Sequence, residues 1–217
     1  VGVCLRMFFS GTFTDAGLLH KTIGVLHELV NECSATISEN GVFIQAMDAS
    51  HVCLVALDWP ADSFKSFTSN GSIRIGLHVG NLLKILKCSN KSDSVTLAID
   101  EDTADTLSIA FSDNDRTATF CMRLLDRDDD QLSVPEMMHD ALVAMPSLEF
   151  LAACRDLSTL SDTTTVTVDA NGLTLVSHGD IGSATLTYAH VRVDKPNSLS
   201  QTFALRYMNS FAKGSQI

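Results

Sequence analysis

The chain repeats its own order of elements, and this repeat limits the folds open to it more than any other feature does. Leu19, Ile23, Leu26 and Val30 recur at spacings of three and four, which predicts an amphipathic helix over residues 18–32. Two β-prone runs follow on either side of Asn40-Gly41, a strong hairpin signal. The second half of the chain repeats this order of a helix followed by a hairpin, with a predicted helix over 147–158 and a turn at Asn171-Gly172.

A second pair of segments extends the repeat. Residues 80–88 and 204–213 both predict short amphipathic helices with basic residues near their C-terminal ends. Further strands are predicted at 94–99, 106–111, 118–124 and 183–189. An internal duplication of this kind predicts an α+β protein with two similar domains, each with two helices packed on antiparallel sheet. We expect domains over 1–123 and 137–217, joined by a charged, Pro-containing linker over 124–136.

Charge is distributed unevenly between the predicted elements. The formal net charge of −11 argues against nucleic acid as a partner when it is taken alone. The four predicted helices, however, hold six basic and four acidic residues, a net charge of +2, which leaves −13 for the rest of the chain. Charge alone favours ordinary solvated helix faces, and the alternative is a protein that is acidic outside and basic along one inner surface. Screening over about 8 Å allows the second arrangement, since distant acids need not cancel a local basic surface.

Several function classes lack their sequence signatures. The six cysteines are widely spaced, without a zinc or redox motif, and favour a reducing compartment. No apolar run is long enough to span a membrane. Asp48, Ser50 and His51 superficially resemble parts of a hydrolase, but no Gly-x-Ser-x-Gly elbow or phosphate-binding glycine loop is present. We therefore expect no enzyme activity, no catalytic residue, no metal and no cofactor.

Six separate segments resemble one family in its own order. They are Gln45-Ala46-Met47-Asp48-Ala49-Ser50-His51-Val52, Leu83-Lys84-Ile85-Leu86-Lys87-Cys88, Thr103-Ala104-Asp105-Thr106-Leu107, Gln131-Leu132-Ser133-Val134-Pro135, Cys154-Arg155-Asp156-Leu157-Ser158 and Phe203-Ala204-Leu205-Arg206-Tyr207. With them the chain resembles the proliferating cell nuclear antigen family of eukaryotic sliding clamps. The resemblance implies the DNA clamp fold in a closed homotrimeric ring, with helices lining a central channel and sheets outside. It also implies a nuclear processivity factor for replication and repair.

The resemblance assigns residues to three surfaces. Channel positions facing duplex DNA would be His20, Lys21, His27, Lys84, Lys87, Arg116, Arg155, Arg206 and Lys213. A pocket for short peptide motifs of DNA polymerases and other client proteins would be formed by Met47, His51, Val52, Leu54, Leu132 and Val134. The contact between subunits would involve Phe120, Leu157, Leu160, Ile181 and Ala184. A clamp loader is implied as a further partner, and no membrane.

The chain also departs from the family pattern. His20 and His27 stand where lysines are usual, and Ala152 replaces another basic channel residue. Ala170 occupies the position of the lysine that receives ubiquitin, and Ala184 replaces a glycine at the subunit contact. We expect the second domain to lack the family's last strands and tail, since the sequence stops at 217. Two alternatives stay open: a subunit of a heterotrimeric checkpoint clamp, and a peptide-binding ring scaffold without a DNA role.

Overall fold

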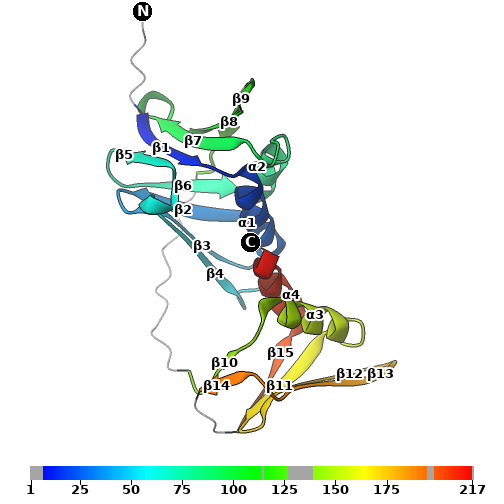
Figure 1. Cartoon of the computed structure of the whole chain (residues 1–217). Coiled ribbons are helices and arrows are strands. Elements are labelled where there is room, and N and C mark those ends of the chain that lie inside the picture. Colours follow the sequence, from blue (N-terminus) through cyan, green and yellow to red (C-terminus); the bar gives the residue numbers. More distant parts are fainter. Residues whose placement is uncertain (1–6, 114, 127–138, 195–197, 217) are drawn as a thin grey trace, which may run out of the picture. The chain divides into compact units, whose positions relative to one another are not determined.

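The computed structural model describes residues 7–113, 115–126, 139–194 and 198–216 (Figure 1). Its contacts divide the chain into two compact units, Val1–Leu132 and Ser133–Ile217. Residues 124 and 125, at the start of the predicted linker, are still bonded to the first unit. The Leu124 amide donates to Asp105 and the Leu125 amide donates to Gly76.

The first unit contains two helices and nine strands in two antiparallel sheets. One sheet has the order β5-β1-β7-β8-β9 and the other has the order β4-β3-β2-β6. In chain order the elements are β1 (Met7–Phe13), α1 (Ala16–Leu29), β2 (Glu32–Ser38), β3 (Gly41–Met47), β4 (Leu54–Pro60), β5 (Ser66–Ser69), β6 (Ile73–His78), α2 (Val79–Leu86), β7 (Ser94–Asp100), β8 (Thr106–Ser112) and β9 (Thr117–Arg123).

A local cap sets where α1 begins, whereas strand pairing sets where it ends. The Asp15 side chain caps the helix by accepting hydrogen bonds from the amides of Gly17 and Leu18. The helix was predicted to reach residue 32 but ends at Leu29, because Val30 takes an extended conformation and Glu32 already pairs with His78 of β6. Tertiary pairing of β2 thus shortens a helix that the apolar stripe alone would have continued.

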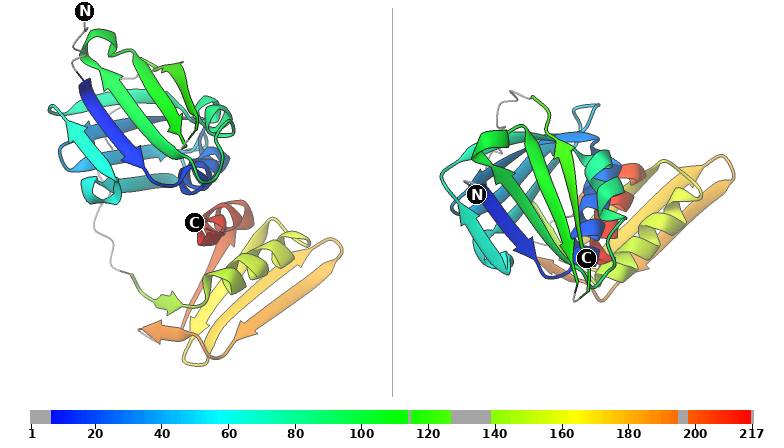
Figure 2. Two further views of the ribbon diagram at one scale, coloured as in Figure 1. Left: turned by 45° about the horizontal axis from the view of Figure 1, so that its top comes forward. Right: turned by 90° about the horizontal axis from the view of Figure 1, so that it is seen from above.

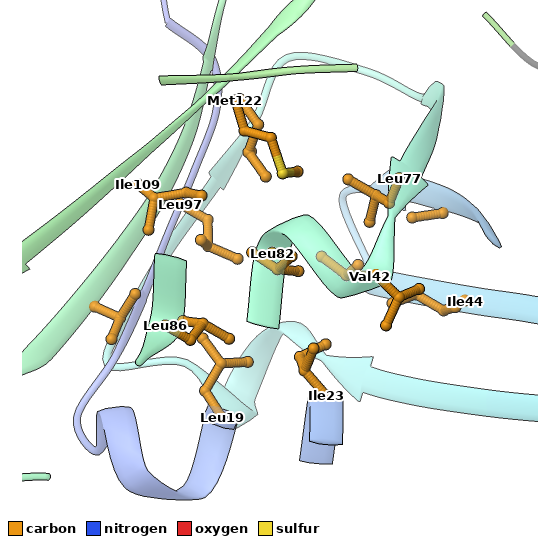
Figure 3. Packing of buried hydrophobic residues seen from close by; sticks show 14 of the residues in the cluster. Leu19, Ile23, Val42, Ile44, Leu77, Leu82, Leu86, Leu97, Ile109 and Met122 are labelled. Atoms are coloured by element: carbon orange, nitrogen blue, oxygen red, sulfur yellow. The ribbon is translucent and has the colours of Figure 1, made fainter. Parts of the chain in front are cut away.

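The helices and both sheets of the first unit share one apolar core. Figure 3 shows Leu19 and Ile23 from α1 together with Leu82 and Leu86 from α2. Val42 and Ile44 from β3 and Leu97, Ile109 and Met122 from the other sheet pack on them. Each helix therefore buries one stripe and leaves its opposite side to solvent.

The second unit repeats the first part of this plan. Its elements are β10 (Leu142–Ala144), α3 (Ser147–Ser158), β11 (Thr163–Asp169), β12 (Gly172–Gly179), β13 (Gly182–Tyr188), β14 (Arg192–Asp194), β15 (Leu199–Ala204) and α4 (Leu205–Lys213). The sheet order β13-β12-β11-β15 reproduces β4-β3-β2-β6, and β14 pairs with β10 as β5 pairs with β1. In Figure 2, α3 lies across one face of this sheet. The predicted duplication is confirmed at the level of strand pairing, although β7, β8 and β9 have no counterpart among the described residues of this unit.

Candidate functional site

Exposed cations lie on the solvent side of the helix pair in the first unit. Helices α1 and α2 pack against each other. Lys21 of α1 and Lys84 and Lys87 of α2 are exposed, whereas Leu82 and Leu86 are buried beneath them. Lys84 lies in the last turn of α2 and Lys87 is its C-cap residue, where cations are also favoured by the helix dipole. The helix pair of the first unit thus exposes three lysines, together with Glu28 of α1.

The two histidines of α1 are less exposed than its lysine. His20 and His27 are only partly exposed, whereas Lys21 is exposed. His20 Nε2 and His27 Nδ1 are buried and have no hydrogen-bond partner among the described residues. A Cβ atom at Gly80 of α2 would lie 3.0 Å from His27 Cε1 and 3.3 Å from His78 Cε1, so both imidazoles pack over this glycine. The glycine therefore lets the helices approach closely at His27.

The helix pair of the second unit carries a similar set of cations. Arg155 of α3 and Arg206 and Lys213 of α4 are exposed. Arg206 lies 4.5 Å from the centre of the Tyr207 ring, an arrangement that restrains the guanidinium while leaving it accessible. Arg116, the remaining predicted cation, is exposed on the β8–β9 turn, where its carbonyl accepts from the Asp113 amide, and so it is not a helix residue.

The predicted client residues of the first unit gather at one hairpin end. Met47 and Leu54 face each other as the last register pair of β3 and β4. Loop 48–53 joins them and carries His51 and Val52, both exposed, with Val52 69% accessible. Leu132 and Val134 lie outside the described residues. The structure therefore brings four of the six predicted pocket residues to one loop and its closing pair.

Two of the five residues predicted for the subunit contact, Phe120 and Ala184, lie on edge strands. β9 is an edge of the first sheet of unit one, and β13 is an edge of the main sheet of unit two. Phe120 is half-buried and contacts Phe111 edge-on at 5.6 Å between ring centres. Ile181 is 79% accessible at the β12–β13 turn, and Leu160 and Ala184 are partly exposed. Leu157 is only 1% accessible and belongs to the core of the second unit, so it is not available for direct contact with another subunit.

Asp48, Ser50 and His51, which resemble parts of a hydrolase in the sequence, are not hydrogen-bonded in the order that a catalytic serine needs. The Ser50 hydroxyl donates to the Asp48 carboxylate, whereas a nucleophilic serine would donate to the histidine. No group of three or more His, Cys, Asp or Glu side chains within the described ranges is arranged to hold a metal ion. No helix there is long and apolar enough to cross a membrane.

Burial raises the pKa values of two cysteines and one tyrosine. Burial raises the pKa of the Cys154 thiol to about 11. Burial, together with the nearby Asp48 carboxylate, raises the pKa of the Cys53 thiol. Burial and the carboxylates of Glu149 and Asp156 raise the pKa of Tyr188. Cysteines held as neutral thiols behave as small apolar residues and not as nucleophiles.

Two α+β units that repeat one four-stranded sheet order, each with a pair of helices that bears exposed cations, define the DNA clamp class. The family model for the N-terminal domain of proliferating cell nuclear antigen matches residues 8–132, and the model for its C-terminal domain matches residues 133–217. Proliferating cell nuclear antigen 2 of Drosophila melanogaster is 34% identical over 206 residues, which cover 92% of this chain and 81% of that protein. The chain belongs to the proliferating cell nuclear antigen family of DNA sliding clamps.

Sequence reasoning missed the role of Asp48 in loop 48–53. Its carboxylate is 8% accessible and accepts hydrogen bonds from several groups of the loop that follows it. An aspartate followed two residues later by serine is a signal for an Asx-type turn, and this signal was available in the sequence.

Proposed function

We propose that this chain forms a closed homotrimeric ring around duplex DNA. It acts there as a processivity factor for DNA polymerases and as a docking platform for replication and repair proteins in the nucleus. Residues 124–136 would connect the two domains of each subunit. The observation that carries the proposal is the gathering of exposed cations on both helix pairs of a chain whose net charge is −11.

The charge distribution supports DNA as the ligand of the helix surface. Lys21, Lys84 and Lys87 in one unit and Arg155, Arg206 and Lys213 in the other would contact phosphates, and Arg116 would add a further contact from the β8–β9 turn. Such contacts carry no sequence information, and they weaken steeply with salt, so they permit sliding. The acidic remainder of the chain would discourage DNA from binding to any other surface.

The two edge strands support ring closure. β9 presents Ala118, Phe120 and Met122 on its inner face, and β13 presents Ala184, Leu186 and Tyr188 on its inner face. Pairing of β9 with β13 of a second copy would join two inner faces of similar character and cover two open edges. Size-exclusion chromatography with light scattering tests this proposal. A mass of three chains is expected, and a monomer at micromolar concentration would contradict it and favour a heterotrimeric clamp.

The loop with His51 and Val52 supports docking of client peptides. An accessible apolar side chain, flanked by the half-buried Met47 and Leu54, suits a short peptide that inserts apolar and aromatic anchors. Leu132 and Val134 would complete the pocket. Polymerases, other client proteins and a clamp loader are the partners that we infer for this surface.

Topological retention on DNA is the direct test of the whole proposal. A clamp loader would place the ring on a nicked circular plasmid, and the complex would be isolated by gel filtration. Retention should be lost when the plasmid is linearised, because the ring slides off the ends. A peptide-binding scaffold without a DNA role would show no retention on either form, and that result would overturn the DNA part of the proposal.

A further inference from the structure

We propose that Asp48 is a positioning residue that holds loop 48–53 in the conformation that receives client peptides. The proposal rests on the client-docking part of the proposed function. In this proposal the buried carboxylate of Asp48 fixes the conformation of loop 48–53, and the side chains that would touch the peptide do not.

Both oxygens of the Asp48 carboxylate accept hydrogen bonds from the loop. Oδ1 accepts from the amide of Val52 at 2.8 Å and from the amide of Cys53 at 2.7 Å. Oδ2 accepts from the amide of Ser50 at 3.3 Å and also from the Ser50 hydroxyl. Charge-assisted hydrogen bonds of this kind are about twice as strong as neutral ones. The carboxylate therefore holds Ser50, Val52 and Cys53 around itself.

The main chain of the same residue closes the loop a second time. The Asp48 amide donates to the Cys53 carbonyl at 2.9 Å, and the Asp48 carbonyl accepts from the His51 amide at 2.9 Å. Between these bonds His51 has a φ of 57°, the only positive φ among the non-glycine residues that the structure describes. A non-glycine residue keeps this left-handed conformation only where its surroundings impose it, and here the bonds to Asp48 do so.

This geometry separates the inside of the loop from its outside. Asp48 and Cys53 are buried at 8% and 6% accessibility, whereas Val52 between them is 69% accessible. With its amide tied to the buried carboxylate, Val52 must direct its apolar side chain outward. Its backbone is thus fixed before a peptide arrives, which reduces the ordering cost of binding.

Loss of the carboxylate should lower the population of this loop conformation. If the competent conformation falls to about a tenth of the molecules, the apparent affinity for a peptide falls about tenfold. Asp48→Ala removes every acceptor. Asp48→Asn keeps one oxygen for the amides of Val52 and Cys53 but sets an NH2 group against the Ser50 amide, so we expect an intermediate loss.

Two further variants separate positioning from contact and from charge. Val52→Ala removes a side chain that would touch the peptide but leaves all the bonds to Asp48 in place. Asp58→Asn makes the same charge change as Asp48→Asn at an exposed position of β4. Thermal unfolding of each full-length variant shows whether the fold is retained, and Asp48→Asn decides the question if Asp48→Ala unfolds.

The experiment measures two quantities on each full-length protein. Fluorescence anisotropy gives the affinity for a labelled peptide that carries aliphatic and aromatic anchors, and hydrogen–deuterium exchange gives the protection of the amides of Val52 and Cys53. We expect weaker binding with faster exchange in both Asp48 variants. Val52→Ala should bind more weakly with unchanged exchange at Cys53, and Asp58→Asn should change neither quantity.

The outcomes that would overturn the proposal are distinct from those that would overturn the client pocket. Wild-type affinity in both Asp48 variants, or weaker binding with unchanged exchange, would refute the positioning role. Absence of peptide binding by the wild-type chain would instead refute the proposed client site. In that case the exchange data would still report whether Asp48 orders the loop.

Discussion

Neutralising the two lysines at the end of α2 should flatten the salt dependence of DNA binding. Lys84 and Lys87 are exposed on the side of α2 that lies opposite the buried Leu82 and Leu86. Each phosphate contact contributes about 0.9 to the slope of log affinity against log salt, so loss of two contacts lowers the slope by about 1.8 for each engaged subunit. For one engaged subunit, this difference in slope amounts to roughly a tenfold change in affinity between about 50 and 200 mM salt.

The assay is fluorescence anisotropy of a short labelled duplex titrated with Lys84→Gln/Lys87→Gln over that salt range. The variant should bind more weakly at low salt but lose about tenfold less affinity than the wild type as salt rises. The control Lys65→Gln/Arg74→Gln makes the same charge change at two exposed positions outside the helices. An unchanged slope in the α2 variant, or an equal flattening in the control, would refute the assignment of DNA to the helix surface.

Three further predictions concern stability. Because the pKa of Cys154 is raised to about 11 from 9.0, its neutral thiol favours the folded state. The contribution is complete below pH 9 and is lost as pH rises through the folded pKa. Urea unfolding should therefore show the wild type losing about 2 kcal/mol more than Cys154→Ala between pH 8 and 11, and parallel pH profiles would contradict this cause. Gly179→Ala should destabilise the second unit by more than about 2 kcal/mol in thermal unfolding, since the new Cβ would lie 1.6 Å from the Leu160 carbonyl oxygen. If the variant keeps the wild-type melting temperature, the hairpin relaxes freely and the prediction is wrong. His51→Val should cost roughly 1–2 kcal/mol in urea unfolding because a β-branched residue resists a φ of 57°, whereas His51→Asn should be tolerated, and equal stabilities would argue that the loop rearranges.

The repeated element order was predictable from sequence because its signals are local. The apolar spacing of α1 and the Asn-Gly turns at 40–41 and 171–172 report backbone conformation over a few residues. The structure places α1, α2, α3 and α4 within a few residues of their predicted positions. Sorting charge by predicted helix also needed no tertiary information, and it correctly located exposed cations on all four helices.

Sequence by itself determined the duplication, the helix surfaces and the family resemblance, whereas tertiary structure decided the environment of individual side chains. Leu157 and His27 lie on predicted helices, but only packing shows that the leucine is a core residue and that the imidazole is pressed against Gly80. The burial of a single atom depends on elements far away in the chain, and periodicity does not report it. The same holds for Asp48, whose carboxylate becomes the centre of a loop only when β3 and β4 pair and bring residue 53 back beside residue 48.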